Sequence, residues 1–393
     1  MGGGATRAYN VAKCLALNGC NVTVITAFPH YPTGNIPKAY RWKPFKQETS
    51  DGLRIIRTFV PPIASEGLMK RLILFLSFMI SSLFALPFVG NEDVVWGANP
   101  NILSIFPARF YGLLKRIPTA LNVDDLWPED LCNIGLIEKN SLTAKIVGFA
   151  ARLAYFKANL ITPISPGYVR VICGKYGIDP EKVHVVRAGV DLSKFRVAGN
   201  SSNHCGDDFR VLYSGAFSVL YDFDQVLLAA KTLEKAEGVE FVLQGGGELA
   251  DYLKSRVRKL GLNNFEVVDK IVSREEVAKL LRDACALILP LRDFGTPYLG
   301  LSLKLYEYQA VGKPILCCSE GEPGRYVSET GSGIVIKPGD HEALARSILY
   351  LKENRGVADK LGMSGRRYVA SNLSVEEIGL NMKRLLGSLP FTA

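Results

Sequence analysis

The sequence predicts an α/β protein with parallel sheets and two domains. Short apolar runs that suit buried strands alternate along the chain with segments that suit helices, which is the order that builds parallel sheets. The clearest case is a strand–loop–helix–strand unit from Leu287 to Ser319. A chain of 393 residues is long for a single core, which favours two domains.

The unit from Leu287 to Ser319 has the layout of a ligand site. Its loop is rich in glycine, proline and serine and opens a predicted helix from about Leu303 to Val311. Parallel sheets bind ligands at such loops, which follow the carboxyl ends of strands. Lys304 and Glu307 lie one turn apart on one helix face. Taken alone, this spacing is equally typical of an ordinary surface ion pair.

The segment SLKLYEYQAVGKPI resembles a known enzyme motif. It is similar to the region around the second glutamate of the E-x7-E motif in retaining GT-B glycosyltransferases of glycosyltransferase family four. The nearest pattern belongs to a branch that builds polysaccharides and O-antigens and includes fucosamine-transferase-like enzymes. The residues that match are Lys304, Glu307, Tyr308, Ala310, Gly312, Lys313 and Pro314. Leu299 stands where the family has its first motif glutamate, and Ser302 replaces the usual proline.

This resemblance extends from Gly2 to the last predicted helix. It implies two Rossmann-like, doubly wound domains that face each other across a cleft. Residues 1–188 would form the acceptor and membrane domain, and residues 189–372 the nucleotide-sugar donor domain. Residues 373–393 would form a helix that crosses back to the first domain. The family has a β-strand before its first glycine loop, and we expect this strand to be missing from the N-terminus.

Composition limits the possible partners. The net charge of +9 suits phosphates or an anionic membrane, and no nucleic-acid-binding motif is present. The eight cysteines form no C-x-x-C pair, and we expect reduced core cysteines such as Cys285, Cys317 and Cys318. These features predict a cytoplasmic protein. The N-terminus has glycines where a signal peptide would have an apolar core.

Two N-terminal segments contain candidate site residues. Gly3 and Gly4 precede a helical pattern that runs through Leu17, and glycines ahead of a helix let backbone N–H groups approach an anion. Three glycines are also typical of a flexible start. The resemblance implies that they face the donor phosphates. His30 lies in the loop HYPTG, which resembles an acceptor-side loop of the family, although a lone histidine there is commonly structural.

The stretch from Leu68 to Val89 is the most apolar in the sequence. It is consistent with a buried helix, an interfacial membrane helix or a marginal membrane span. Lys70 and Arg71 at its start suit anionic head groups. Related glycosyltransferases dock on the membrane through this part, so we expect peripheral association with the inner face of the cell membrane.

The segment DDLWPED at residues 124–130 follows a predicted strand from Pro118 to Val123. Its carboxylates could bind a metal, act as bases or cap the next helix. The segment closely resembles the DLWPES element that borders the acceptor site in the same branch. We therefore select Asp125 and Glu129 as candidates, without assigning their roles.

The second half of the chain contains the candidate donor residues. Gly215 follows a strand at 209–214, and the diphosphate-binding Arg and Lys of many relatives are absent from the next residues. Gly246 follows a second strand and Lys270 a third. The pyrophosphate would then depend on Lys304 and on backbone amides, and Glu307 would hold the ribose hydroxyls. The amides would come from Gly300, Leu301, Ser302 and Leu303.

The resulting hypothesis is a retaining glycosyltransferase. It would move a sugar from a nucleotide-sugar donor, a UDP-sugar in the first instance, to a glycan or polyprenyl-linked acceptor. No metal motif is present, and we expect no cofactor. Two alternatives remain open. One is a nucleotide-sugar 2-epimerase-like enzyme, which shares the two-domain plan. The other is a catalytically degenerate partner subunit, which Leu299 and the missing strand would explain.

Overall fold

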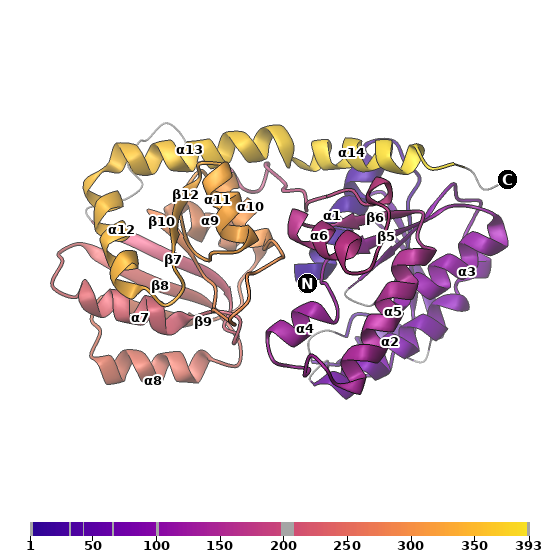
Figure 1. Cartoon of the computed structure of the whole chain (residues 1–393), viewed down its shortest axis with the longest axis horizontal. Helices are drawn as coiled ribbons and strands as arrows, with labels where there is room; N and C mark the ends of the chain where they lie inside the picture. The colour runs from indigo at the N-terminus through magenta and orange to yellow at the C-terminus, as the bar shows by residue number, and fades with distance from the viewer. Residues whose placement is uncertain are drawn as a thin grey trace. The chain divides into compact units, whose positions relative to one another are not determined.

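The chain folds into two compact units (Figure 1). The computed structural model describes residues 3–30, 33–41, 43–64, 67–99, 102–197 and 208–390. Unit 1 comprises Met1–Gly189 and Val375–Ala393, and unit 2 comprises Val190–Ser374. Most of the predicted polar loop at 200–208 lies outside the described residues, as do Tyr31 and Pro32 of the HYPTG loop.

Unit 1 contains two separate three-stranded sheets, in the orders β1-β3-β2 and β4-β5-β6. Their strands are β1 (Thr23–Ala27), β2 (Phe45–Ser50), β3 (Leu53–Thr58), β4 (Val95–Ala98), β5 (Thr119–Val123) and β6 (Leu160–Pro163). All pairs are parallel except β2 with β3. In the part of the chain that the structure describes, no strand joins β1 to β4.

The β2–β3 hairpin is an element that the sequence interpretation did not include. It turns at Asp51 and Gly52, whose φ angles are 50° and 75°. Tight hairpin turns require such positive φ angles, and Asp-Gly pairs favour them. A local sequence signal for this hairpin was therefore present.

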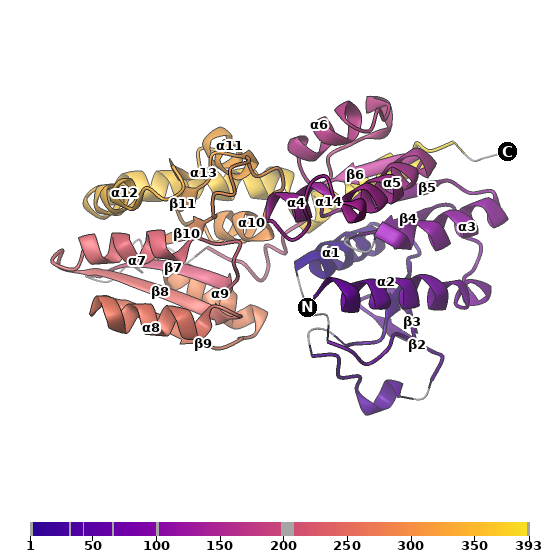
Figure 2. The same ribbon diagram turned by 60° about the horizontal axis from the view of Figure 1, so that its bottom comes forward.

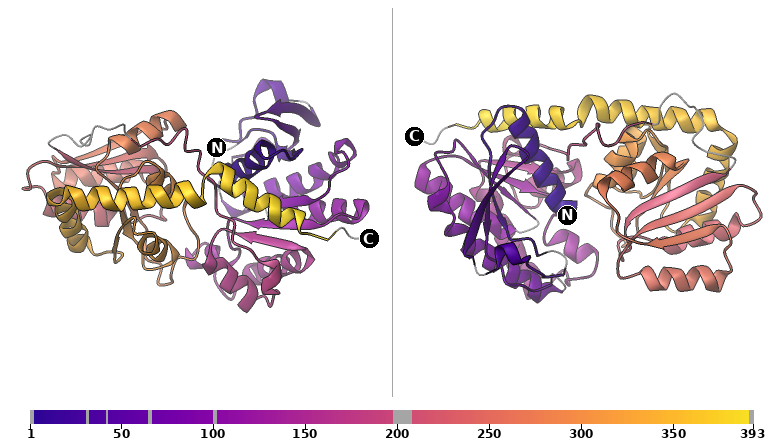
Figure 3. Two further views of the ribbon diagram at one scale, coloured as in Figure 1. Left: turned by 90° about the horizontal axis from the view of Figure 1, so that it is seen from above. Right: turned by 180° about the vertical axis from the view of Figure 1, so that it is seen from behind.

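Helices cover the sheets of unit 1. They are α1 (Gly3–Leu17), α2 (Leu68–Leu83), α3 (Ile105–Lys115), α4 (Glu129–Asn133), α5 (Leu142–Lys157), α6 (Pro166–Gly174) and α14 (Val375–Gly387). Short 3-10 turns are η1 (Lys38–Tyr40), η2 (Leu86–Phe88), η3 (Ile102–Ser104) and η4 (Pro180–Lys182). Helix α14 packs along α1, so the last helix of the chain completes the unit that the first helix begins (Figure 3).

The predicted apolar helix is only partly buried. Helix α2 ends at Leu83, and Leu74 on its inner side is buried. A row of exposed apolar side chains covers its other side: Met69, Leu72, Ile73, Leu76, Ile80 and Leu83. Among the helices of the described ranges, none combines the length and apolar character that a bilayer crossing requires.

Unit 2 is a doubly wound sheet of six parallel strands with helices on both faces (Figure 2). The strand order is β12-β11-β10-β7-β8-β9. The strands are β7 (Phe209–Ala216), β8 (Val239–Gly246), β9 (Phe265–Asp269), β10 (Ala286–Pro290), β11 (Ile315–Cys318) and β12 (Gly333–Ile336). The helices are α7 (Phe223–Thr232), α8 (Ala250–Leu260), α9 (Arg274–Asp283), α10 (Leu303–Ala310), α11 (Glu322–Glu329), α12 (His341–Glu353) and α13 (Arg355–Asn372).

The predicted α/β architecture with two Rossmann-like units is confirmed. Strands β10 and β11 are buried along their whole length, as their apolar runs predict. Cys317 and Cys318 are buried free thiols. The expectation of reduced cysteines is wrong for Cys285, which is disulfide-bonded.

The contact between α14 and α1 predicts how unit 1 responds to one added methyl group. A Cβ at Gly379 would lie 2.7 Å from the Cys14 carbonyl oxygen and 2.8 Å from the Cys14 Cβ. We expect Gly379→Ala to lower the free energy of unfolding of unit 1 by about 1–3 kcal/mol, as overpacking does.

Urea denaturation followed by tryptophan fluorescence measures this effect, because all three tryptophans precede residue 190. Gly387→Ala is the matched control, since a Cβ there meets no atom within 4 Å. Equal stability of the Gly379 and Gly387 variants would contradict the proposed close contact.

Candidate functional site

In unit 1, polar side chains gather where β5 and β6 end. The Arg7 guanidinium, buried on α1, donates to the side-chain oxygens of Asn122 and Asp124. It also donates to the carbonyl oxygens of Thr162 and Val186. One charged group thus contacts residues at the carboxyl ends of both β5 and β6. Arg7 therefore fixes α1 against this edge of the sheet, which is where parallel folds place their ligand sites.

Asp125 lies next to this cluster and is half-buried. Its backbone is held by Asn99, whose side-chain nitrogen donates to the Asp125 carbonyl oxygen at 2.7 Å. Burial, followed by the charges of Asp124 and Asp130, raises the pKa of the Asp125 carboxyl to about 7 against a smaller opposing effect of Arg71. A carboxyl with this pKa can both accept and release a proton near neutral pH.

Asp130 is the last of the four carboxyl groups of the strand-end segment and lies at the start of α4. It accepts hydrogen bonds from Tyr168 Oη at 2.6 Å and from the Leu126 N–H at 2.7 Å. Burial raises its pKa to about 6, although both hydrogen bonds oppose the rise. These bonds tie the segment to α6, so Asp130 has a structural role in this arrangement.

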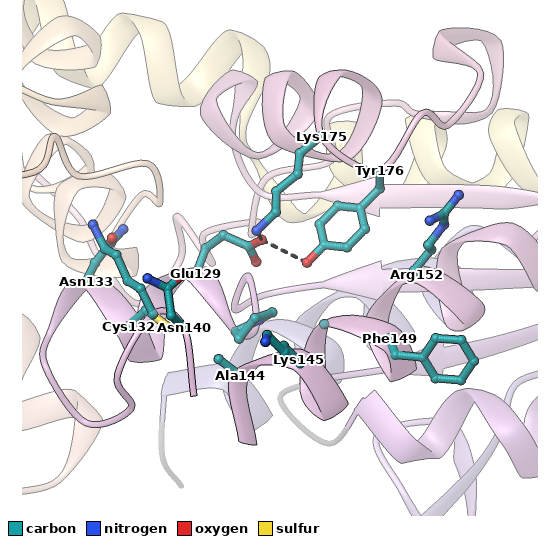
Figure 4. Close-up of a pocket in the computed structure, with 13 residues that line it drawn as sticks. Glu129, Cys132, Asn133, Asn140, Ala144, Lys145, Phe149, Arg152, Lys175 and Tyr176 are labelled. Carbon is teal, nitrogen blue, oxygen red and sulfur yellow. Dashed lines mark hydrogen bonds and ion pairs between the residues drawn. The ribbon is translucent and has the colours of Figure 1, made fainter. Parts of the chain in front are cut away.

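Glu129 makes its side-chain contacts with the residues that follow α6. Its carboxylate accepts hydrogen bonds from Lys175 Nζ at 2.7 Å and from Tyr176 Oη at 2.8 Å. Figure 4 shows these contacts at the edge of a cavity of about 670 Å³. The structure therefore does not group the two carboxylates selected from the sequence.

The remaining candidates of unit 1 are His30, Gly3 and Gly4. The His30 Nδ1–H donates to the Phe28 carbonyl oxygen at 2.8 Å, an interaction that orders the loop after β1. Gly3 and Gly4 lie in the first turn of α1 rather than in a loop ahead of it.

In unit 2, a polar network holds α10 against the sheet. The Tyr308 hydroxyl lies 3.5 Å from the Ile288 carbonyl oxygen of β10 and 3.5 Å from the Ser214 N–H of β7. The Gln309 side chain donates to Thr330 and Ser332 and accepts from Tyr326. Because both side chains are buried and hydrogen-bonded, α10 has one defined position.

Lys304 lies in the first turn of α10 against two tyrosines. Its Nζ donates to Tyr221 Oη at 2.9 Å and lies 5.0 Å from the Tyr221 ring centroid and 5.6 Å from that of Tyr213. The Cβ of any other residue at Gly215 would overlap Lys304 Cε. Gly215 thus leaves room for the lysine to pass over the end of β7, and the two aromatic rings orient its charge.

Glu307, one turn further along α10, is buried and paired with Arg274 at the start of α9. The Arg274 guanidinium lies over the Phe195 ring at 5.2 Å and is about half exposed. The charge of the buried Glu307 carboxylate is compensated by this one accessible cationic partner. A ligand hydroxyl can exchange with Arg274 without leaving the carboxylate unpaired.

The loop before α10 presents backbone groups beside Lys304. Ser302 caps the helix, with its Oγ accepting from the Lys304 N–H at 3.3 Å. Gly300 and the buried Leu301 precede this cap, and Leu303 is the first residue of the helix. A cavity of about 220 Å³ lies nearby, between residues 291–298 and the segment after β11.

The remaining two donor candidates differ in what they contact. Gly246 ends β8, and its carbonyl oxygen accepts from the Phe217 N–H at 2.9 Å. The neighbouring Gly245 is the position where β7 and β8 approach closely, since a Cβ there would overlap the Gly215 carbonyl oxygen. Lys270 is exposed and directly follows β9. Its carbonyl oxygen accepts a hydrogen bond from the Gln244 side-chain nitrogen at 2.6 Å.

Three residues with defined contacts were not selected from the sequence: Arg7, Tyr221 and Arg274. A signal existed for Arg7, which lies four residues before Val11 on the apolar face of its helix, where a charge needs a buried partner. Tyr221 stands in the segment where many relatives have cations. Arg274 had no signal, because its partner is 33 residues away.

The two halves of the chain match two described families. Residues 1–194 match Glycosyltransferase Family 4, and residues 198–368 match Glycosyl transferases group 1. The probable glycosyltransferase WbjE of Pseudomonas aeruginosa is 26% identical over 66% of this chain. This chain spans 65% of that relative, slightly less than two thirds of its length. The putative colanic acid biosynthesis glycosyl transferase WcaI of Escherichia coli is 26% identical over 94% of this chain and 92% of its own length.

Solved structures share the fold. Sucrose-phosphate synthase from Thermosynechococcus elongatus superposes with a TM-score of 0.76 and 18% identity, covering 99% of this chain and 94% of that one. Anabaena HepE in complex with UDP and glucose superposes with a TM-score of 0.70 and 15% identity, covering 99% and 96%. At these identities the likeness shows the fold alone.

The raised pKa of Asp125 predicts a pH dependence of stability. Between about pH 4, where an unfolded aspartate titrates, and about pH 7, the native state binds more protons than the unfolded chain. Asp125 therefore stabilises unit 1 fully below this window, and the contribution is lost as the pH rises through it.

We expect Asp125→Asn to have the stability of the native chain at about pH 4 and to be the more stable protein at about pH 8. Asp130 titrates in the same direction in both proteins, so the difference between the two urea curves isolates Asp125. Parallel pH profiles of the two proteins would show that Asp125 titrates normally.

Proposed function

We propose that this chain, whose first half matches Glycosyltransferase Family 4 and whose second half matches Glycosyl transferases group 1, is a glycosyltransferase that transfers a sugar from a nucleotide-sugar donor with retention at the anomeric carbon. The observation that supports the donor site best is the pair of Lys304 and Glu307 on one face of α10, next to the amides that open this helix. Each group suits a different part of a nucleotide sugar.

Glu307 suits the ribose. An ionised carboxylate accepts hydrogen bonds from two vicinal hydroxyls, and such charge-assisted bonds are about twice as strong as neutral ones. In this proposal the ribose hydroxyls take the place of Arg274. The arginine then moves into solvent, where its half-exposed side chain already lies.

Lys304 suits the diphosphate leaving group. As the sugar departs, negative charge grows on the phosphate oxygens, and a fixed cation with helix-end amides stabilises it. Tyr221 and Tyr213 hold the Lys304 ammonium in place before the ligand arrives. This support matters here because the segment from Ala216 to Tyr221 contains no cation of its own.

The choice of UDP and of a polysaccharide product rests on relatives. HepE and trehalose-6-phosphate synthase, which share the fold, have structures described as bound to UDP or to a UDP-sugar. WcaI is named for colanic acid biosynthesis, and an Erwinia amylovora relative, 25% identical, is named for amylovoran biosynthesis. We propose a UDP-sugar donor and a glycan or polyprenyl-linked acceptor on this basis.

Asp125 is our candidate for the acceptor side. Its carboxyl has a pKa of about 7, so at neutral pH it can accept a hydrogen bond from an acceptor hydroxyl and take up the proton. Retention by departure and attack on the same face needs close placement of the acceptor rather than a protein nucleophile. Glu129, bound to Lys175 and Tyr176, is assigned no chemical role in this proposal.

We also propose that the chain is cytoplasmic and attaches to the inner face of the cell membrane through α2. The exposed apolar row on α2 is the kind of surface that an interfacial helix places among lipids, and Lys70 and Arg71 begin the same helix. Helix α3, which packs against α2, adds the exposed side chains of Phe110, Leu113 and Leu114.

The two alternatives are not favoured by the comparisons, since WbjE and WcaI are named as a probable and a putative glycosyltransferase. Incubation with a UDP-sugar in the absence of an acceptor distinguishes an epimerase from a glycosyltransferase, because an epimerase would convert the UDP-sugar into its epimer. A degenerate subunit would be indicated by absent UDP-sugar binding, and Leu299 in place of a motif glutamate is the feature that motivates this test.

We expect Glu307→Ala to abolish binding of UDP-glucose and UDP-N-acetylglucosamine in calorimetry, because the ribose loses its hydrogen-bond acceptor. Arg274→Ala is the matched control, since it breaks the same ion pair but keeps the carboxylate. We expect it to bind donor at least as tightly as the native chain. Unchanged affinity in Glu307→Ala, or equal losses in both variants, would remove the ribose role.

We expect the variant with Leu72, Leu76 and Leu83 changed to serine to move from the membrane fraction to the soluble fraction. All three side chains lie in the exposed row, so the fold should tolerate the changes. A control changes Leu17 and Leu380, which are exposed elsewhere in unit 1. Continued pelleting of a correctly folded triple variant would refute attachment through α2.

A further inference from the structure

The cavity of about 670 Å³ beside Glu129 has no part in the chemistry proposed above. It lies within unit 1 and is walled by α4, the loop after α4, α5 and the residues that follow α6 (Figure 4). Its volume falls in the range of about 300–1,000 Å³ that small-molecule sites occupy. The side chains of its wall indicate which class of ligand fits.

The wall of this cavity is cationic. Lys139, Lys145, Arg152 and Lys175 line it, and Glu129 is the one carboxylate among its lining residues. That carboxylate is bound to Lys175. Within the described parts of the chain, Lys139, Lys145 and Arg152 form no ion pair. Three uncompensated cations around a hollow are complementary to an anion.

An exposed apolar row borders the cavity on α5. Leu142, Ile146 and Phe149 are 72%, 60% and 69% exposed. Their spacing of four and three residues places them in one row along the helix. Lys145 and Arg152 stand next to this row on the same helix. A contiguous apolar row in water marks a surface that another molecule covers.

Cations beside an exposed apolar row form the pattern of a helix that lies at a membrane surface. Long basic side chains reach the phosphate head groups while their apolar neighbours enter the acyl region. We propose that this cavity holds the phosphate of an anionic membrane lipid while Leu142, Ile146 and Phe149 enter the bilayer beside it.

This lipid site adjoins the surface proposed for attachment. Helix α3 packs against both α2 and α5, and the three helices lie next to one another in unit 1 (Figures 1 and 2). The inference therefore rests on the membrane docking proposed for α2. It goes further, because α2 explains attachment to any bilayer whereas the cavity adds recognition of lipid charge.

A second copy of this chain fits the apolar row and the cations of α5 less well than an anionic bilayer does. A two-fold contact through this row would bring the cations of one copy close to the same cations of the other. Like charges that face each other across an interface weaken it by several kcal/mol. An anionic bilayer covers the same apolar side chains and also neutralises the cations.

Vesicle flotation of the full chain tests the proposal. The probes are vesicles of phosphatidylcholine alone and vesicles that also contain phosphatidylglycerol. We expect the double variant Lys145→Gln, Arg152→Gln to bind the anionic vesicles about 30-fold more weakly, since each basic side chain near such a surface contributes about 1 kcal/mol. Its binding to phosphatidylcholine vesicles should equal that of the native chain.

The matched control is the double variant Lys182→Gln, Arg384→Gln, which removes two exposed cations of unit 1 that do not line the cavity. We expect it to keep the preference for anionic vesicles. Native-like anionic binding by the cavity variant overturns the proposal. Equal loss by the control overturns it as well, because the effect would then come from net charge.

Phe149→Ser separates lipid from self-association. We expect it to weaken binding to both kinds of vesicle and to leave sedimentation of the free protein unchanged. A change in sedimentation would identify the row as an interface between copies and would overturn the proposal. If only the α2 variant loses vesicle binding, the lipid site fails while the docking through α2 stands. UDP-sugar calorimetry, which reads unit 2, should be unaffected in every variant.

Discussion

The packing of unit 1 depends on the hydrogen bonds that the buried Arg7 guanidinium makes to other parts of the chain. Its partners are Asn122, Asp124 and two carbonyl oxygens, and they come from three different segments of the chain. A buried charge that loses its partner destabilises a protein by about 3–5 kcal/mol, so these contacts hold α1 firmly in place. The same contacts keep the Asp124 carboxylate beside Asp125, where its charge helps to raise the Asp125 pKa. One ion pair thus supports the packing of the unit and the chemistry of its strand ends.

In unit 2, the helix that carries the candidate site residues is held by buried hydrogen bonds between uncharged side chains rather than by a buried charge. Tyr308 and Gln309 bury polar groups that are hydrogen-bonded to β10, to α11 and to the residue that follows α11. These contacts leave α10 no freedom to rotate, so Lys304 and Glu307 are directed to the same side by a rigid support. Preorganised charges of this kind need no rearrangement when a ligand's charge develops, which is where electrostatic catalysis gains its strength. The two tyrosines around Lys304 extend the same principle to a flexible side chain.

Local sequence patterns were sufficient for the α/β class and for part of the site, while the plan of two Rossmann-like units came from the family resemblance. Apolar runs located β10 and β11, and the three-residue spacing of Lys304 and Glu307 placed both on one helix face. The Asp51-Gly52 hairpin also had a local signal, which was not used. Contacts between distant segments were not predictable in this way. Arg7 meets Asp124 across 117 positions, and Lys304 meets Tyr221 across 83, and no periodicity encodes such pairs.

The discontinuous construction of unit 1 has a consequence for biosynthesis. Helices α1 and α14 pack together although nearly the whole sequence separates them. During translation, every residue of unit 2 leaves the ribosome before α14 does, and domains generally fold in the order in which they emerge. Unit 2 can therefore mature while the side of α1 that meets α14, which includes Cys14, is still uncovered. Until α14 is released, this side of α1 stays exposed to solvent, and apolar surface exposed in this way makes an incomplete chain prone to aggregation.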